Sequence, residues 1–185
     1  MGRGRCPDHG HRGSGSSWQG GRRPSSVYGA FGLWAAASPR RSFLPQGLDG
    51  ADSWATDAHK TLNTPYDCGI AIVRQETALR RAFGHEAAYL LHSEEPDPHE
   101  HVPELSRRAR GVPVWAALRT LGVDGLADLV DGLVHSAAGI ADGLRDLEGI
   151  HVLHDVVYTQ VTACLDNDEL TDAVLASLLA EGCIR

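Results

Sequence analysis

The pattern of hydrophobic and polar positions separates a leader without periodicity from a longer part with helix-like and strand-like periods. Residues 1–26 are rich in arginine, glycine and serine, lack regular apolar spacing, and are predicted to form a disordered leader. Apolar residues cluster from Val27 onward, and residues 29–34 (GAFGLW) have the composition of a turn followed by a short helix. Folded structure is therefore predicted to begin near Val27.

Two short segments in the first half of the chain are predicted to be β-strands. Residues 51–55 are one candidate. Residues 68–73 (CGIAIV) are the stronger one, because a short apolar run rich in isoleucine fits a strand that is buried on both faces. A helix is predicted to follow at residues 75–83.

Prolines interrupt the middle of the chain. Residues 92–104 contain three prolines among acidic residues and histidines, so we predict an exposed loop without regular structure. A loop of this length in a compact domain is often a functional lid. Residues 106–121 then predict a helix that is bent near Pro113.

The clearest helix is predicted at residues 124–147, and it is expected to pack on a sheet rather than in a coiled coil. Gly149 should end it, followed by strands at 150–153 and 156–165 and a helix at 169–180. This order is α/β, and the change of character after the proline-rich loop suggests a domain junction near the long helices. The apolar residues of the 124–147 helix fall on one face and are Leu126, Val130, Leu133, Ala137, Ile140, Leu144 and Leu147.

Composition narrows the class of protein. With 185 residues, 42% of them hydrophobic, and a formal net charge of -7, the chain is predicted to be globular, with one compact domain or parts of two. No uninterrupted apolar run approaches the roughly 18–20 residues needed to cross a bilayer, and the N-terminus lacks the apolar core of a secretory signal. We therefore expect a cytoplasmic protein without membrane contacts.

Positive charge is concentrated near the N-terminus. The first 45 residues carry seven arginines against the single acid Asp8. Arginine beside glycine and serine suggests that this segment binds nucleic acid. However, Trp18 is the only aromatic residue of the leader, so no platform for stacking bases is evident and no nucleic-acid partner is expected. An alternative hypothesis for the function of the chain is an arginine-rich binding module in the leader, with the α/β part as its scaffold.

The cysteines and histidines form no recognised metal or disulfide pattern. The 4 cysteines are widely spaced and include no CxxC pair, which indicates free thiols in a reduced compartment. Residues 99–101 (HEH) and the pair His151 and His154 bring possible ligands together, but neither group has a completing ligand at a recognised spacing. No metal site is predicted.

Lys60 is the strongest candidate for chemistry. It follows the strand candidate at 51–55 and precedes the turn at 63–66 (NTPY), which puts it in a strand-end loop where α/β sheets bind ligands. Lys60 is also the only lysine among 17 lysine and arginine residues, and lysine, unlike arginine, can lose its proton and attack a carbonyl. From spacing alone, a solvated surface lysine would look the same.

The segment 51–74 (ADSWATDAHKTLNTPYDCGIAIVR) resembles the cofactor-lysine segment of the group II pyridoxal-phosphate-dependent amino acid decarboxylases. Further blocks agree in the same order, and the resemblance covers roughly residues 27–185. It implies a partial, incomplete chain of the fold type I transferase architecture. Residues 27–122 would be the C-terminal part of the large, mostly parallel-sheet domain, and 123–185 the truncated start of the small α/β domain. The further blocks are residues 29–38, 106–122 and 149–182.

The resemblance also implies an activity, a cofactor and a partner. The chain would decarboxylate an L-amino acid, as a carboxy-lyase, with pyridoxal 5'-phosphate held on Lys60 as a Schiff base. His59 would lie by the cofactor phosphate, and Asp57 occupies a position from which a polar residue commonly reaches that phosphate. Such enzymes work as homodimers on an amino acid substrate. A related aminotransferase activity is the other possibility, and the DAHK sequence favours decarboxylation.

The chain departs from the family pattern at Tyr28 and in the lid loop. Tyr28 stands where the family has an aspartate that pairs with the pyridine nitrogen, and a phenol with a pKa near 10 cannot supply that anion. The lid loop lacks the tyrosine that often donates a proton, which leaves His92, His99 and His101, here interpreted as solvated loop residues. Nothing before Tyr28 resembles the first half of the family. A catalytically inactive remnant is therefore the alternative hypothesis.

Overall fold

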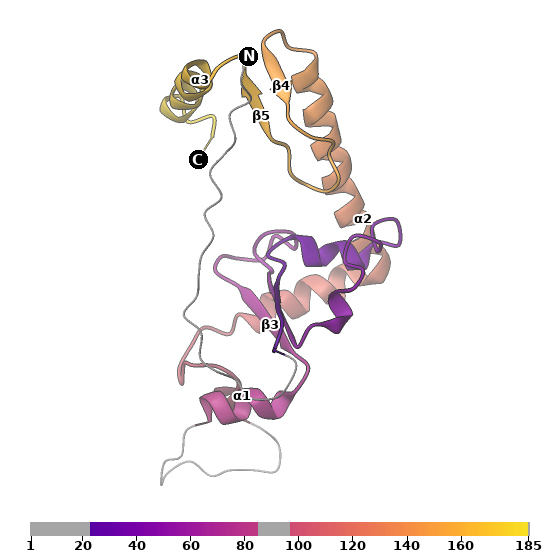
Figure 1. The fold of residues 1–185 in the computed structure, drawn as a ribbon. Helices are drawn as coiled ribbons and strands as arrows, with labels where there is room; N and C mark the ends of the chain where they lie inside the picture. Colours follow the sequence, from indigo (N-terminus) through magenta and orange to yellow (C-terminus); the bar gives the residue numbers. More distant parts are fainter. Residues whose placement is uncertain (1–22, 85–96, 185) are drawn as a thin grey trace.

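The structure is a computed structural model that describes residues 23–84 and 97–184 (Figure 1). The predicted leader falls mostly outside this part, and Val27 lies in the middle of the first strand, which confirms the predicted start of folded structure. In chain order the elements are β1 (Ser26–Tyr28), η1 (Gly32–Ala37), η2 (Leu48–Gly50), β2 (Ser53–Asp57), β3 (Gly69–Val73), α1 (Glu76–Phe83), η3 (Pro98–His101), α2 (Gly111–Arg145), β4 (Ile150–Val152), β5 (Ala163–Leu165) and α3 (Asp168–Ala180), where η marks a 3₁₀-helix.

Strands β1, β2 and β3 form one sheet in that order. β1 runs parallel to β2, with Tyr28 opposite Ala55, whereas β2 runs antiparallel to β3, with Asp57 opposite Gly69. The carboxyl ends of β1 and β2 therefore lie at the same edge of the sheet, and the turn from β2 to β3 leaves from that edge. β2 begins two residues later than predicted, because Ala51 still closes the preceding 3₁₀-helix through its bond to the carbonyl of Leu48.

The prediction that β3 is buried on both faces is wrong for the described chain. β3 is an edge strand that pairs only with β2, and the side chain of Ile72 is 45% exposed. Ile70 is partly buried against Ala58, Leu62 and Cys68. The apolar run correctly indicates a strand, but burial depends on what packs on the strand, which its own pattern does not report.

The proline-rich segment contains regular structure where it is described. Its first residues, 92–96, lie outside the described part, but η3 forms a 3₁₀-helix directly after Asp97, so the prediction of a wholly irregular loop is wrong. Pro98 opens this helix, at a position where the missing N–H of proline breaks no helical hydrogen bond. A proline is tolerated at the start of a helix, whereas a proline in the interior of a helix would break it.

The helix predicted at 75–83 is confirmed as α1, with Gln75 as its N-cap. Two contacts between acidic and basic side chains join η3 to α1. Arg80 Nε lies 3.1 Å from Glu100 Oε2, and His101 Nε2 lies 3.3 Å from Glu76 Oε1. The sequence analysis interpreted His101 as a solvated loop residue, but its side chain contacts Glu76. His99 departs from that interpretation too, since its Nε2 is shielded from solvent without a hydrogen-bond partner in the described ranges.

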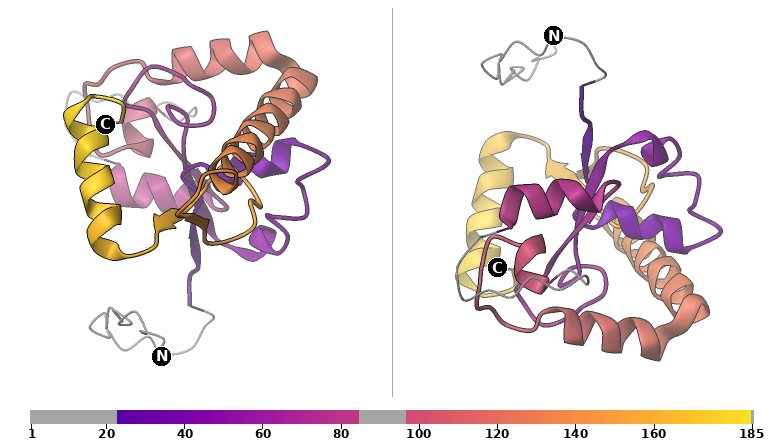
Figure 2. Two further views of the ribbon diagram at one scale, coloured as in Figure 1. Left: turned by 90° about the horizontal axis from the view of Figure 1, so that it is seen from above. Right: turned by 90° about the horizontal axis from the view of Figure 1, so that it is seen from below.

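Helix α2 joins the two helices predicted at 106–121 and 124–147, and its break lies at Gly122 rather than near Pro113 (Figure 2). Gly122 has φ 64° and ψ -169°, a conformation that is essentially restricted to glycine. Pro113 lies in the first turn of α2, where the backbone N–H has no helical acceptor, so proline is tolerated there without a bend.

Beyond the break, α2 buries only one side of its predicted apolar face. Val130 and Ala137 are buried together with Val134 and Ala141, whereas Leu133 and Ile140 are exposed. α2 packs against η1 and β4. It also contributes to the hydrophobic cluster of Ala58, Leu62 and Cys68, through Val114, Leu121, Leu126 and Leu129. No helix of residues 23–84 and 97–184 is long and apolar enough to span a membrane.

The C-terminal part follows the predicted order with one shorter strand. Gly149, with φ 79°, follows the end of α2, and β4 pairs antiparallel with β5. β5 covers only the last three residues of the predicted 156–165 strand, and the preceding residues form a long connection between β4 and β5. The final helix is confirmed as α3, whose N-cap Asn167 accepts a hydrogen bond from the backbone N of Leu170 at 2.8 Å.

Candidate functional site

The turn between β2 and β3 presents His59 and Lys60 because the residues around them are buried. Ala58 and Leu62 are 0% and 5% exposed and belong to a small hydrophobic cluster with Cys68. The backbone N of Ala58 bonds to the carbonyl of Cys68 at 2.9 Å, which closes the base of the turn. These contacts fix the backbone on both sides of Lys60, so its side chain has to extend away from the cluster.

Lys60 lies at the carboxyl end of β2, near an anion and an aromatic ring. Its Nζ is 2.8 Å from Asp57 Oδ2, and the same nitrogen lies 5.8 Å from the centroid of the Phe31 ring. The Lys60 side chain is 42% exposed and that of Asp57 is 16% exposed. The structure thus brings together two of the predicted site residues, and it adds Phe31, which the sequence analysis did not assign to the site.

The ion pair keeps the amine charged. The hydrogen bond to Asp57 is the main cause that raises the pKa of Lys60 above its ordinary value. The same bond is the main cause that lowers the pKa of Asp57, and the Tyr28 hydroxyl contributes in that direction through a hydrogen bond. An amine attacks a carbonyl only when it is uncharged, so in this arrangement Lys60 must first lose a proton that Asp57 stabilises.

His59 is held by the other end of the turn. Its Nδ1 lies 3.0 Å from both the backbone N and the backbone O of Cys68, and its ring meets the ring of Tyr66 edge-on at 4.4 Å between centroids. His59 is therefore oriented by the protein before any ligand binds. It is adjacent to Lys60 in sequence, but its contacts are with a different set of residues.

Tyr28 lies where the sequence analysis expects it, as the last residue of β1 before the GAFG turn. It is 74% exposed and paired in register with Ala55, two residues before Asp57. The carboxyl edge of the parallel pair β1 and β2 thus carries a phenol on one strand and a carboxylate on the next.

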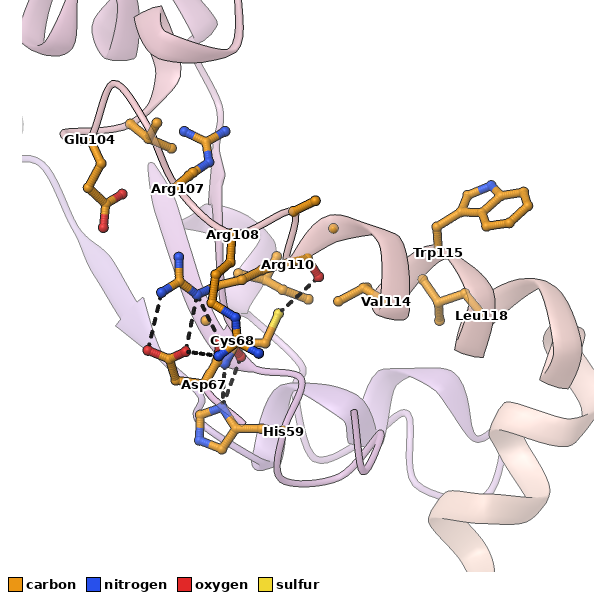
Figure 3. A pocket seen from close by; sticks show the side chains of 15 residues that line it. His59, Asp67, Cys68, Glu104, Arg107, Arg108, Arg110, Val114, Trp115 and Leu118 are labelled. Atoms are coloured by element: carbon orange, nitrogen blue, oxygen red, sulfur yellow. Dashed lines mark hydrogen bonds and ion pairs between the residues drawn. The ribbon is translucent and has the colours of Figure 1, made fainter. Parts of the chain in front are cut away.

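An open cavity of about 770 Å³ lies beside His59 (Figure 3). Neither Lys60 nor Asp57 lines it. Its polar wall includes Arg110, whose Nε and Nη2 lie 3.2 and 3.3 Å from the two carboxylate oxygens of Asp67, and Arg108, 3.7 Å from the same carboxylate. Its apolar wall is the first half of α2, with Val114, Trp115 and Leu118.

The sequence analysis did not assign this cavity, although the run RRAR at 107–110 was the available signal. In the described part of the chain, no group of three or more His, Cys, Asp or Glu side chains is arranged to hold a metal ion. Two aspartate–cation pairs lie at the turn, Asp57 with Lys60 and Asp67 with Arg110, and Arg108 lies near the second carboxylate.

The sequence that contains this turn matches a known protein family. Residues 29–165 match the model of the pyridoxal-dependent decarboxylase conserved domain. The chain belongs to the pyridoxal-dependent decarboxylase family. The match includes the whole β2–β3 turn with Lys60, and it confirms the family resemblance drawn from residues 51–74. The cofactor named by the family is pyridoxal phosphate, as predicted.

Individual members of the decarboxylase family are similar over part of their length. The chain is 34% identical to an aromatic-L-amino-acid decarboxylase of Bacillus atrophaeus over 108 residues, which is 56% of this chain and 22% of that protein. It is 36% identical to a tyrosine decarboxylase of Oryza sativa over 125 residues, 64% of this chain and 24% of the relative. The chain thus spans about a quarter of the length of these curated relatives.

Solved structures agree with the fold. Oryza sativa TDC with PLP and tryptamine matches with a TM-score of 0.74 at 23% identity, over 84% of this chain and 34% of that one. Mouse CSAD in apo form matches with a TM-score of 0.67 at 21% identity, over 78% and 30% of the two chains. These matches confirm the predicted α/β fold as part of fold type I.

Proposed function

We propose that this chain carries the cofactor-lysine part of a pyridoxal-phosphate-dependent L-amino acid decarboxylase, and that Lys60 is the residue that holds the cofactor. The observation that carries the proposal is the position of the only lysine. It is partly exposed at the carboxyl end of β2, in a turn that lies within the matched family region. α/β sheets commonly bind ligands at this edge.

The residues around Lys60 fit an aldehyde cofactor with an aromatic ring. Lys60 offers an amine, Phe31 offers an aromatic face, and His59 is an oriented imidazole that can donate or accept a hydrogen bond. Asp57 fits a phosphate less well, because two anions repel each other. The lowered pKa keeps Asp57 ionised, so that repulsion is offset by the Lys60 nitrogen while it carries a positive charge and by the Tyr28 hydroxyl as a hydrogen-bond donor.

When bound, pyridoxal phosphate supplies an electron sink for the carbanion that forms as an amino acid loses CO2. The role of the protein's own groups is to manage the proton on Lys60 Nζ. Asp57 stabilises the ammonium at 2.8 Å, and its lowered pKa makes it a weak base, so the proton leaves to solvent when the ion pair opens. The Phe31 ring, 5.8 Å from the same nitrogen, also stabilises the cation.

A catalytically inactive member of the family is the second candidate, and Tyr28 favours it. The family resemblance puts an aspartate at this position, and an uncharged phenol cannot keep a pyridine nitrogen protonated. The nearest described carboxylate in this network is Asp57, which is already paired with Lys60. Cofactor attachment without decarboxylation is the behaviour expected of such a protein.

The relatives suggest which substrates to assay first. Those named above are decarboxylases of aromatic amino acids or tyrosine, so we propose an aromatic L-amino acid as the substrate. A homodimer belongs to the same proposal and can be checked by light scattering of the purified chain. The proposed division into residues 27–122 and 123–185 can be checked by limited proteolysis.

The test of the cofactor role is chemical. The purified chain is incubated with pyridoxal phosphate and reduced with borohydride, which makes attachment to lysine irreversible, and the modified peptide is identified by mass spectrometry. We expect modification at Lys60, and modification confined to the N-terminal amine would contradict the proposal. Release of CO2 from aromatic amino acids then separates the two candidates, since attachment without release would favour the inactive one.

A further inference from the structure

Tyr158 reaches the Lys60 site from the C-terminal part of the chain. It lies in the connection between β4 and β5, which in Figure 1 extends from the small sheet toward the first part of the chain. Its hydroxyl donates a hydrogen bond to the carbonyl of Phe31 at 3.4 Å, across 127 positions of sequence. Tyr158 is therefore a direct link between the C-terminal sheet and the residue whose ring lies under the Lys60 ammonium.

The carbonyl of Phe31 is a shared acceptor. Thr61 Oγ1 also donates to it at 3.4 Å, and Thr61, which is buried, follows Lys60 directly. The preceding carbonyl, that of Ala30, accepts from the backbone N of Asp57 at 2.9 Å and from Thr56 Oγ1 at 3.2 Å. These bonds tie the Phe31 backbone to the strand and turn that carry Asp57 and Lys60.

We propose that Tyr158 is a positioning residue for Lys60: by holding the Phe31 carbonyl beside Thr61, it sets where the Phe31 ring lies against the lysine amine. The inference rests on the proposed role of Lys60 as the cofactor lysine. The Phe31 ring and the Asp57 carboxylate both stabilise the charged form of the Lys60 amine. Movement of the ring therefore changes how strongly the amine is held in its charged form. Burial raises the pKa of the Tyr158 hydroxyl, which therefore stays a donor to higher pH than a solvent-exposed phenol.

The single lysine makes the test direct. Reductive methylation with ¹³C-formaldehyde labels only Lys60 and the N-terminal amine, so the NMR spectrum contains one lysine resonance. In Tyr158→Phe we expect this resonance to shift, because the ring current of Phe31 acts on it, and its pH titration to move. With unmethylated protein, the rate of pyridoxal phosphate attachment should change by about two- to tenfold, as for the loss of one hydrogen bond.

Val157→Ala is the matched control, since Val157 is the exposed neighbour of Tyr158 and its loss removes no hydroxyl. A Tyr158→Phe resonance and titration that match those of Val157→Ala would overturn the proposal. If Tyr158→Phe fails to fold, Thr61→Val decides, because it removes the other donor to the same carbonyl and should shift the resonance too. The NMR measurement needs no cofactor, so its outcome is separate from that of the attachment test at Lys60.

Discussion

Two aspartate–cation pairs lie near opposite ends of the β2–β3 turn, and their difference shows where chemistry is available. Asp57 pairs with Lys60 at the start of the turn, and Asp67 pairs with Arg110 near its end. The two carboxylates are alike in that each has its pKa lowered by its cation. The cations differ, because an ammonium can be deprotonated under mild conditions and a guanidinium cannot.

The matched family region, residues 29–165, contains both pairs and the arginine-lined cavity beside His59, so the family match alone does not choose between them. Amine chemistry points to the cluster of Lys60, Asp57 and Phe31, because Lys60 is the only lysine of the sequence.

The largest expected effect follows replacement of the lysine itself. Lys60→Arg keeps the positive charge and can keep the pair with Asp57, but it has no amine that can attack a carbonyl, so borohydride-stable labelling at position 60 should be lost completely. Arg108→Ala is the control and should label at Lys60 like the unmodified chain. Retained labelling at the wild-type level in Lys60→Arg would show that the cofactor attaches elsewhere. Mass spectrometry of the peptide decides.

The second prediction concerns the backbone conformation of Gly122 at the break in α2. Gly122→Ala should destabilise the fold by about 1–3 kcal/mol, because alanine is strained at φ 64° and ψ -169°. Gly132→Ala is the control, since Gly132 lies inside α2 with nothing within 4 Å of an added Cβ, and alanine favours helix. Urea unfolding measures both variants, and equal stability of the two would contradict the strained conformation.

Asp57→Asn should change the reactivity of Lys60 without removing its amine. The Asp57 carboxylate raises the pKa of Lys60, so an amide there lowers that pKa and leaves more uncharged amine between neutral pH and about pH 10. Attachment of pyridoxal phosphate at pH 8 should be faster, by at most about fivefold for a partly exposed pair. Asp67→Asn should leave the rate unchanged, and a slower rate in Asp57→Asn would reverse the sign argued here.

The smallest effect is expected at the second pair. Arg110 lowers the pKa of Asp67 below its ordinary 3.8, so the pair stabilises the folded chain above about pH 4, and that contribution is lost as pH falls through the lowered pKa. Arg110→Ala should lower the melting temperature by a few degrees at pH 7, with a smaller difference at pH 3. Scanning calorimetry at the two pH values checks this, and Lys60 labelling should not change.

The sequence predicted the elements better than their surroundings. α1, α3 and β3 followed from apolar spacing and flanking residues, which are local properties. The boundary between the predicted helices at 106–121 and 124–147 agrees with the break at Gly122, but the bend predicted near Pro113 is wrong. The exposure of β3 did not follow from its sequence, because it depends on neighbouring strands. Long-range packing was therefore the main missing information.

The same division holds at the site. The contact between Asp57 and Lys60 could be expected, because they are three residues apart in a strand-end turn. The Phe31 ring and the Tyr158 hydroxyl could not be expected, because they come from residues 29 positions before Lys60 and 98 positions after it in the printed sequence. The folded sheet brings the Phe31 ring to the amine, and the β4–β5 connection brings Tyr158 to the Phe31 carbonyl.

The glycine break in α2 has a geometric consequence for how sequence changes propagate along the helix. An unbroken α-helix advances by about 100° per residue, so one inserted residue rotates every later side chain by that angle. An insertion near Val130 would turn Val134 and Ala137 out of their contacts. At Gly122 the backbone already leaves the helical path, so the two halves keep independent rotational phases and length changes there can be absorbed without turning either face.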